Sequence, residues 1–154
     1  MSVEKLSNIS NDAVNSLIAI KDSIVLSSAR IRVGKNKHEN ISVYKTSKWF
    51  DWTADQMNTF KSVFSESHVN KAVSGWFLHL PENTGHLDEM DYWQDKPYAG
   101  TVVAYSLTNG NSIVINDVEY TCNAGEGIKF SLKELHKINK TATSRDWACL
   151  MLLQ

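Results

Sequence analysis

Several features that would divide this chain into parts are scarce. Among its 154 residues there are two prolines, Pro81 and Pro97, and no internal repeat, low-complexity tract or Pro/Gly-rich linker. A chain of this length can bury one substantial core but is too short for two. We therefore expect a single domain over residues 1–154. In it, residues 1–70, of mixed helical and strand character, would pack on a core formed by residues 71–154.

No charge of one sign dominates either, since the formal net charge is −1 and basic residues are scattered along the chain. This disfavours nucleic acid as a partner. No apolar run is long enough to cross a bilayer. The opening MSVEKLSNIS lacks the charged start and apolar core of a signal peptide, so we expect a cytoplasmic protein. The two cysteines, Cys122 and Cys149, stand in apolar strand-like surroundings and are expected to be free, buried thiols.

Helical signals are confined to the first half of the chain. The segment NDAVNSLIAI, residues 11–20, predicts a short helix capped by Asn11 or Asp12. Further on, Thr53 is a candidate N-cap and Gln56, three residues later, completes a capping box. Apolar residues then recur at helical spacing on one face. This pattern predicts an amphipathic helix of about three turns that packs on a sheet.

Strand patterns dominate from residue 71, although IVLSSARIRV, residues 24–33, also indicates one or two strands. Short β-branched or aromatic segments alternate with turn signals and leave no room for helices between them. The final segment ACLMLL has no polar alternation, so residues 147–153 are expected inside the fold, covered on both faces. The sequence thus predicts a mainly β protein with N-terminal helices and a double-stranded β-helix (jelly-roll) core. The expected strands are KAVSGWFLHL, GTVVAYSL, NSIVI, VEYTC and GIKFSL.

The segment GHLDEM carries the first candidate site residues. If residues 86–88 are extended, His86 and Asp88 project to the same face and can converge on one metal ion. A third ligand would have to come from another strand, and His136 is the candidate. Two histidines and one carboxylate on one side of a metal form the facial arrangement of non-haem Fe(II) oxygenases.

With these residues, the C-terminal half, roughly residues 72–153, resembles the Fe(II)/2-oxoglutarate-dependent oxygenase superfamily, nearest to its prolyl-hydroxylase-like branch. The family pattern is a His-x-Asp pair, a distal His some tens of residues later and a basic residue about ten positions beyond it. Here these are His86 and Asp88, His136 and Arg145. The turn around residues 125–127, followed by a strand and His136, is also similar to the family's order of elements.

The resemblance implies that His86, Asp88 and His136 bind Fe(II) and act as the catalytic centre. It also implies that Arg145 pairs with the far carboxylate of the co-substrate 2-oxoglutarate and, more loosely, that the Tyr105 hydroxyl lines the co-substrate pocket. The expected activity is hydroxylation of an unidentified substrate, either a protein or peptide side chain or a small metabolite. The reaction would consume O₂ and release succinate and CO₂.

Two positions depart from the patterns of relatives. Many relatives have a small hydroxyl residue two positions after the arginine, where this chain has Trp147, which could narrow the carboxylate pocket. The nucleic-acid dealkylating branch has a second arginine at the position of Met151. Two alternatives therefore stay open. One is a non-catalytic jelly-roll binding or structural protein, and the other is a cupin-like metal protein, although HLD departs from the usual cupin pair of histidines.

Overall fold

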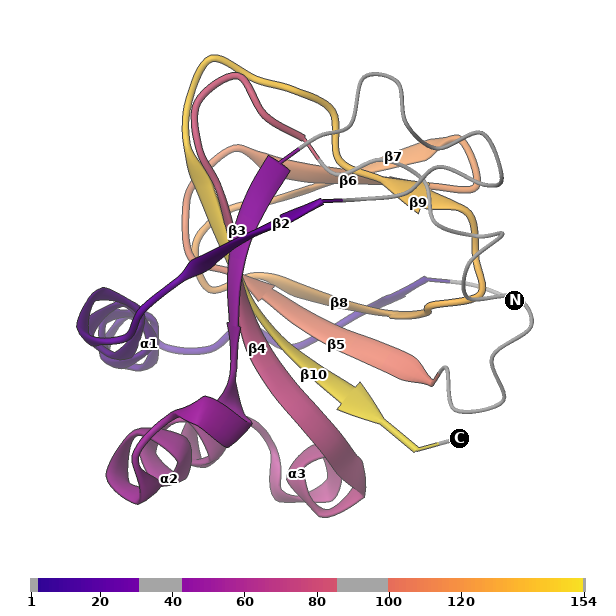
Figure 1. Cartoon of the computed structure of the whole chain (residues 1–154). Helices are drawn as coiled ribbons and strands as arrows, with labels where there is room; N and C mark the ends of the chain where they lie inside the picture. Colours follow the sequence, from indigo (N-terminus) through magenta and orange to yellow (C-terminus); the bar gives the residue numbers. More distant parts are fainter. Residues whose placement is uncertain (1–2, 31–42, 86–99, 154) are drawn as a thin grey trace.

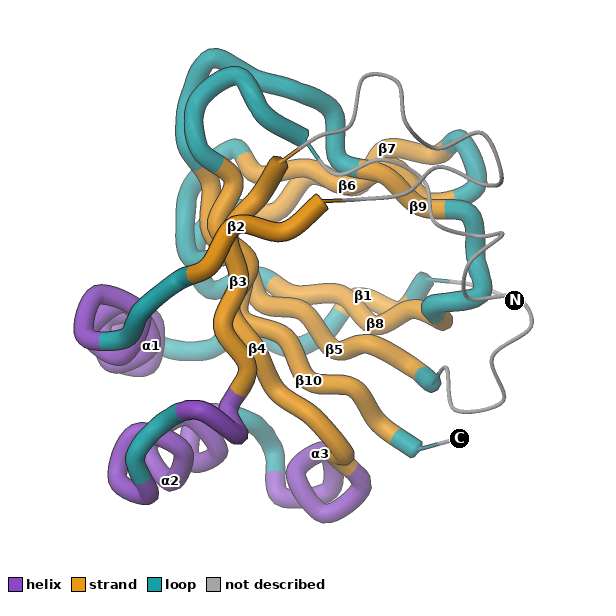
Figure 2. Tube along the Cα trace, in the orientation of Figure 1, coloured by secondary structure: helices purple, strands orange, loops and turns teal. Residues whose placement is uncertain are grey.

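The computed structural model describes residues 3–30, 43–85 and 100–153 (Figures 1 and 2). Antiparallel strands make up most of it, and the helices precede residue 72. No helix in these ranges is long and apolar enough to cross a membrane. The elements in chain order are β1 Glu4–Lys5, α1 Asn11–Ser23, β2 Ser27–Arg30, β3 Val43–Lys48, the 3-10 helix η1 Trp49–Asp51, α2 Ala54–Val63, α3 Glu66–Lys71, β4 Ala72–Leu80, β5 Thr101–Ser106, β6 Asn111–Ile115, β7 Val118–Cys122, β8 Gly127–Ser131, β9 His136–Lys137 and β10 Arg145–Leu152.

The strands form two antiparallel sheets that face each other (Figure 2). The larger sheet has the order β1-β8-β5-β10-β4-β3-β2, and the smaller has the order β7-β6-β9. Neighbouring strands are mostly not consecutive in the sequence, which is the crossover pattern of a jelly roll. The predicted mainly β, jelly-roll architecture is confirmed, and so are all five strands expected after residue 71.

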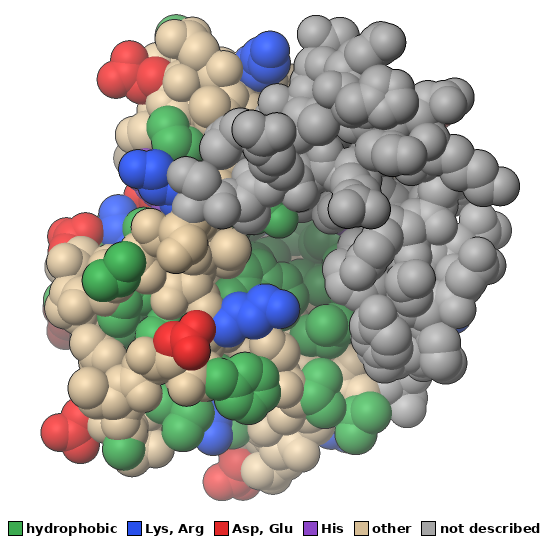
Figure 3. Space-filling model, viewed as in Figure 1, with side chains coloured by type: hydrophobic (Ala, Val, Ile, Leu, Met, Phe, Trp, Pro, Cys, Tyr) green, Lys and Arg blue, Asp and Glu red, His purple; other side chains and the backbone are tan. Residues whose placement is uncertain are grey.

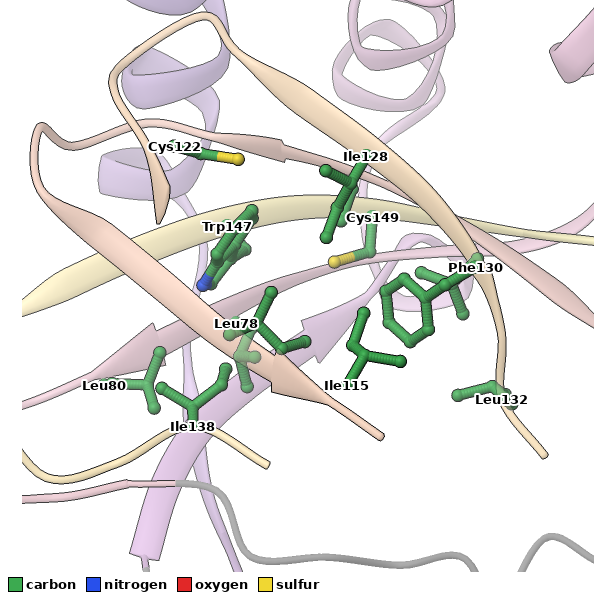
Figure 4. Close-up of a cluster of buried hydrophobic side chains, with 13 residues drawn as sticks. Leu78, Leu80, Ile115, Cys122, Ile128, Phe130, Leu132, Ile138, Trp147 and Cys149 are labelled. Atoms are coloured by element: carbon green, nitrogen blue, oxygen red, sulfur yellow. The ribbon is translucent and has the colours of Figure 1, made fainter. Parts of the chain in front are cut away.

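Strand β10 lies at the centre of the larger sheet, between β4 and β5. Its side chains alternate between the two hydrophobic clusters of the protein, as successive residues of a strand must. Trp147 and Cys149 join the cluster between the sheets (Figure 4), whereas Ala148 and Leu150 join the cluster under α1 and α2. The prediction of a terminal strand covered on both faces is confirmed as far as Leu152, whereas Leu153, at 65% exposure, lies outside the strand and the core.

Both predicted helices are present, and their caps explain where they begin. The α2 capping box is confirmed: the Thr53 hydroxyl accepts from the Gln56 N–H, and the Gln56 side chain accepts from the Thr53 N–H. The predicted N-cap of α1, Asn11 or Asp12, is wrong. Ser10, one position earlier, accepts from the Ala13 N–H, so Asn11 is the first helical residue. All three residue types cap well, so type alone could not choose between them.

The two helices cover the outer face of the larger sheet (Figure 1). Aromatic rings fill the space beneath them, and Phe60 of α2 packs edge-on against Phe77 of β4 at 5.3 Å between ring centroids. Gly75 makes this close approach possible, because a Cβ there would lie 2.7 Å from the Trp49 ring and 2.9 Å from the Phe60 ring. Both cysteines are free and buried, and burial raises the pKa of each thiol.

A buried polar contact ties α1 to the end of the larger sheet. The Asp146 carboxylate accepts from the Lys21 ammonium at 3.0 Å and lies 2.6 Å from Nδ1 of His79 on β4. Burial alone would lower the pKa of Lys21, but the hydrogen bond and attraction to Asp146 outweigh it and raise that pKa above 10.5. The charged form of Lys21 is therefore stabilised by folding.

We expect Asp146→Asn to lower the free energy of unfolding by roughly 1–3 kcal/mol, because it leaves a half-buried ammonium without its counter-ion. Lys21 has a raised pKa when folded, so its contribution is complete below about pH 10.5 and is lost as the pH rises through the folded value. The difference from wild type should thus be full at pH 8 and shrink above pH 10.5 in urea unfolding. Asp22→Asn, which changes an exposed partner of Lys21, should cost under about 0.5 kcal/mol.

Candidate ligand pocket and metal site

A cavity of about 180 Å³ lies between the two sheets. The larger sheet supplies most of its wall, and the smaller sheet and the segment after β9 supply His136, Ile113 and Ile138. Figure 3 shows the opening as a hollow with hydrophobic side chains in its depth and a basic side chain at its edge. The alternation of strands decides which residues reach it, since Trp147 and Cys149 of β10 line the cavity and their direct neighbours do not.

His136 opens β9 and is one of the polar residues of this wall. Its ring is 4% exposed and packs near the Phe130 ring, with 5.7 Å between centroids. Nδ1 lies 2.7 Å from the Glu134 carbonyl oxygen. A carbonyl only accepts hydrogen bonds, so Nδ1 carries a proton, and in the neutral ring the lone pair is then on Nε2. A metal-binding histidine needs this tautomer and this kind of partner on its other nitrogen.

The other two predicted metal ligands, His86 and Asp88, lie outside the described residues. Within the described ranges, no group of three His, Cys, Asp or Glu side chains is placed to hold a metal ion. The chain up to Gly85 does approach the strand of His136: a Cβ on Gly85 would lie 2.4 Å from the Ile138 carbonyl oxygen. Of the predicted triad, His136 alone can be assessed, and its tautomer fits a metal.

Arg145 begins β10 and is 2% exposed, but it does not line the cavity. Its guanidinium donates to three backbone carbonyls, those of Thr143 at 3.2 Å, Asn139 at 2.9 Å and Thr84 at 2.5 Å. It thereby joins the segment after β4 to the segment after β9. No carboxylate of the described residues pairs with it, and burial lowers its pKa.

Trp147 explains why Arg145 is separated from the cavity. The two side chains are neighbours on one face of β10, and Trp147 lines the cavity whereas Arg145 does not. Where many relatives have a small hydroxyl residue, this chain has a large ring that is 2% exposed. The predicted contact between Arg145 and a co-substrate carboxylate stays a prediction, and in this structure the donors of Arg145 serve backbone carbonyls.

Tyr105 also requires a correction, because it lies on the opposite face of the larger sheet. Its ring belongs to the cluster under the helices and packs against Phe64 at 5.6 Å. Its hydroxyl donates to the Ser7 carbonyl at 3.2 Å, and burial raises its pKa. On β5 it is Val102 and Ala104 that face the cavity. The loose likeness of Tyr105 to a pocket residue of relatives overlooked this alternation.

The structure adds two polar residues to the wall that sequence reasoning missed. Lys48 of β3 and Ser74 of β4 both line the cavity. The Ser74 hydroxyl is buried and has no hydrogen-bond partner in the described structure, and the same holds for the Trp147 indole N–H. Buried polar groups are nearly always paired, so these two groups in a pocket wall are available as hydrogen-bond partners for a ligand. The alternation of Tyr44, Thr46 and Lys48 on one face of β3 was the available signal for Lys48.

Comparison with solved structures places this fold among known oxygenases. A prolyl-4-hydroxylase from Pseudomonas putida superimposes with a TM-score of 0.72 at 13% identity, over 99% of this chain and 92% of that one. A Trichoplax adhaerens prolyl hydroxylase, in complex with a hypoxia-inducible-factor peptide fragment, gives 0.71 at 11% identity, over 98% and 83%. A 2OG-Fe(II) oxygenase family protein from Burkholderia pseudomallei gives 0.69 at 9% identity, over 98% and 84%.

At these identities the likeness shows the fold, which is the jelly roll of the 2OG-Fe(II) oxygenases, and confirms the predicted structural resemblance. No protein-family model and no curated protein sequence matches the chain. The chemistry of this chain must therefore be inferred from its own residues.

Replacing Arg145 by Met should lower the free energy of unfolding by roughly 2–4 kcal/mol, because three carbonyls lose a charged donor in a buried place. Urea unfolding measures this, and Lys140→Met, an exposed change in the preceding loop, should stay within about 0.5 kcal/mol of wild type. Wild-type stability of the Arg145 variant would show that the guanidinium does not serve these carbonyls.

A second prediction compares the hydroxyls of Ser74 and Ser106, of which only the second has hydrogen-bond partners in the described structure. Ser74→Ala removes a group that has no partner and should leave stability unchanged or raise it by up to about 1 kcal/mol. Ser106→Ala should cost about 1–2 kcal/mol, because that hydroxyl donates to the Thr108 carbonyl at 2.6 Å and accepts from the Asn111 amide. Equal losses in the two variants, measured by thermal and urea unfolding, would mean that Ser74 is already paired.

Proposed function

We propose that this protein is a non-haem Fe(II)- and 2-oxoglutarate-dependent oxygenase that hydroxylates a small metabolite or a protein or peptide side chain. The observation that carries the proposal is His136: a buried histidine on the inner wall of a jelly roll, with Nδ1 donating and Nε2 as its lone-pair nitrogen. The proposal assigns Fe(II) to His136 together with His86 and Asp88. Iron and its co-substrate would supply the oxidation of an unactivated C–H bond by O₂, with release of succinate and CO₂.

The residues of the pocket suit this chemistry in two ways. Hydrophobic side chains make up most of the wall, so bulk water is kept from a reactive centre. The Glu134 carbonyl fixes the His136 ring, so the lone pair of Nε2 points in one direction. The similar structures include prolyl hydroxylases and a 2OG-Fe(II) oxygenase, which supports the proposed class of reaction.

A second candidate, a non-catalytic jelly-roll binding protein, is favoured by Arg145. Its donors serve backbone carbonyls, and it does not line the cavity, whereas its neighbour Trp147 does. A protein that had lost the co-substrate would tolerate both features. The two candidates differ in whether a keto acid binds in a metal-dependent way.

His136→Ala should abolish binding of Fe(II), because one of three ligands is lost and a ligand bond near 2 Å has no substitute there. Under anaerobic conditions, Fe(II) and 2-oxoglutarate should give wild type the weak visible charge-transfer band of a chelated keto acid, and the variant should lack it. Succinate release against a panel of amino acids, peptides and nucleotides then identifies the substrate class.

The matched control is His68→Ala, since His68 lies on α3, away from the cavity. It should keep the wild-type spectrum. If wild type shows no band and releases no succinate, the oxygenase proposal fails and the non-catalytic candidate remains.

A further inference from the structure

We propose that Lys48 and Ser74 form a carboxylate-binding site in the pocket wall and hold the far carboxylate of the co-substrate in place of Arg145. The identity of the ligand as a 2-oxo acid rests on the proposed function. The binding of a carboxylate rests on three observations that do not depend on the proposed function: the charge of Lys48, the register of β3 on β4 and the Ser74 hydroxyl, which has no partner in the described structure.

Charge is the first observation. Of the described residues that line the cavity, Lys48 is the only Lys or Arg, and none is an Asp or Glu. Lys48 lies in the exposed part of the wall, and its ammonium makes no ion pair or hydrogen bond with the described residues. An apolar pocket with one uncompensated cation favours an anionic ligand.

Register is the second observation. Lys48 of β3 lies directly opposite Trp76 of β4, so Ser74 is its diagonal neighbour on the same face. Diagonal neighbours on adjacent strands lie about 7–8 Å apart, which a lysine side chain spans. An ammonium and a hydroxyl can then donate to the two oxygens of one carboxylate. Ser74 suits this because its hydroxyl is buried, lines the cavity and has no partner in the described structure.

Lys48 and Ser74 share the cavity with His136, which all three residues line. Ser74 pairs with Met151, Met151 with Val102, and Val102 with Phe130, whose ring lies 5.7 Å from the His136 ring between centroids. Three strand spacings of about 4.8 Å make roughly 14 Å from Ser74 to Phe130 across the larger sheet. A ligand held by Lys48 and Ser74 would therefore extend over this sheet face toward His136.

Arg145 is the competing anchor, and its place in the fold disfavours it. It lies one step beyond Trp147 along the strand face and donates to three carbonyls. A carboxylate would have to pass the Trp147 ring to reach it, whereas Lys48 and Ser74 are already in the wall of the cavity.

The test measures binding of two probes, succinate and 2-oxoglutarate, each with and without Mn(II) as a redox-inactive metal. Calorimetry gives the affinities, and fluorescence of Trp76 and Trp147, which line the cavity, gives a second readout. Lys48→Met should weaken succinate binding about tenfold and flatten its salt dependence, since the group is charged but partly exposed. Ser74→Ala should weaken it about threefold to tenfold without loss of stability.

Lys45→Met is the matched control, because Lys45 stands on the same strand and faces away from the cavity. Its affinities should equal those of wild type. Arg145→Lys tests the competing anchor and should change succinate affinity less than twofold.

The outcomes separate this inference from the proposed function. If succinate binding depends on Lys48, the carboxylate site is supported. If Mn(II) at the same time does not raise the affinity for 2-oxoglutarate, the oxygenase proposal is overturned. Metal-dependent binding of 2-oxoglutarate that is equal in wild type and Lys48→Met supports the oxygenase and overturns the site. If neither probe binds wild type, both proposals are wrong.

Discussion

The double burial of β10 is the constraint on which the rest of the molecule depends. A strand hydrogen-bonded on both edges and covered on both faces must place every side chain in one cluster or the other. Ala148 and Leu150 hold the helices, and Trp147 and Cys149 shape the cavity. A slip of one residue would exchange the two sets, so the same pairing fixes the core and the pocket wall.

The two charged residues at the start of β10 point to opposite faces of the larger sheet. Asp146 points toward α1 and binds Lys21, whereas Arg145, its neighbour, points toward the other face and binds carbonyls. Arg145 remains cationic in a buried place without a carboxylate from the described residues, so its field is compensated by peptide dipoles alone. Lys48, not Arg145, is the cation among the described residues that line the cavity, and the rest of that wall is mostly apolar.

The sequence predicts the fold well, because period-two strands, turn residues and a capping box are local signals. The hairpin between β6 and β7 is an example: Asn116 and Asp117 both adopt positive φ, as a type I′ turn requires, and both residue types tolerate it. The sequence predicts the candidate site less well than the fold. Spacing correctly brought His136 to the inner wall, but it could not show that Arg145 is bound by carbonyls of distant segments or that Tyr105 faces the helices. The contacts of Arg145 depend on which distant segments meet, which spacing along one strand does not contain. The face of Tyr105 depends on which side of β5 is turned to the cavity, and alternation alone does not decide this.

Arg145 and Lys48 differ in what surrounds their charged groups, since backbone carbonyls bind Arg145 whereas Lys48 lines the cavity. A guanidinium has five N–H donors, and here at least three serve the backbone, so the arginine stabilises the joint between two segments. Trp147 lies next to Arg145 on the same face of β10 and lines the cavity, which Arg145 does not. In the proposed carboxylate site, the charge of the ligand is therefore balanced by another element. Strand β3 is suited to this because it borders the cavity yet ends in solvent, where a lysine keeps its charge at small cost.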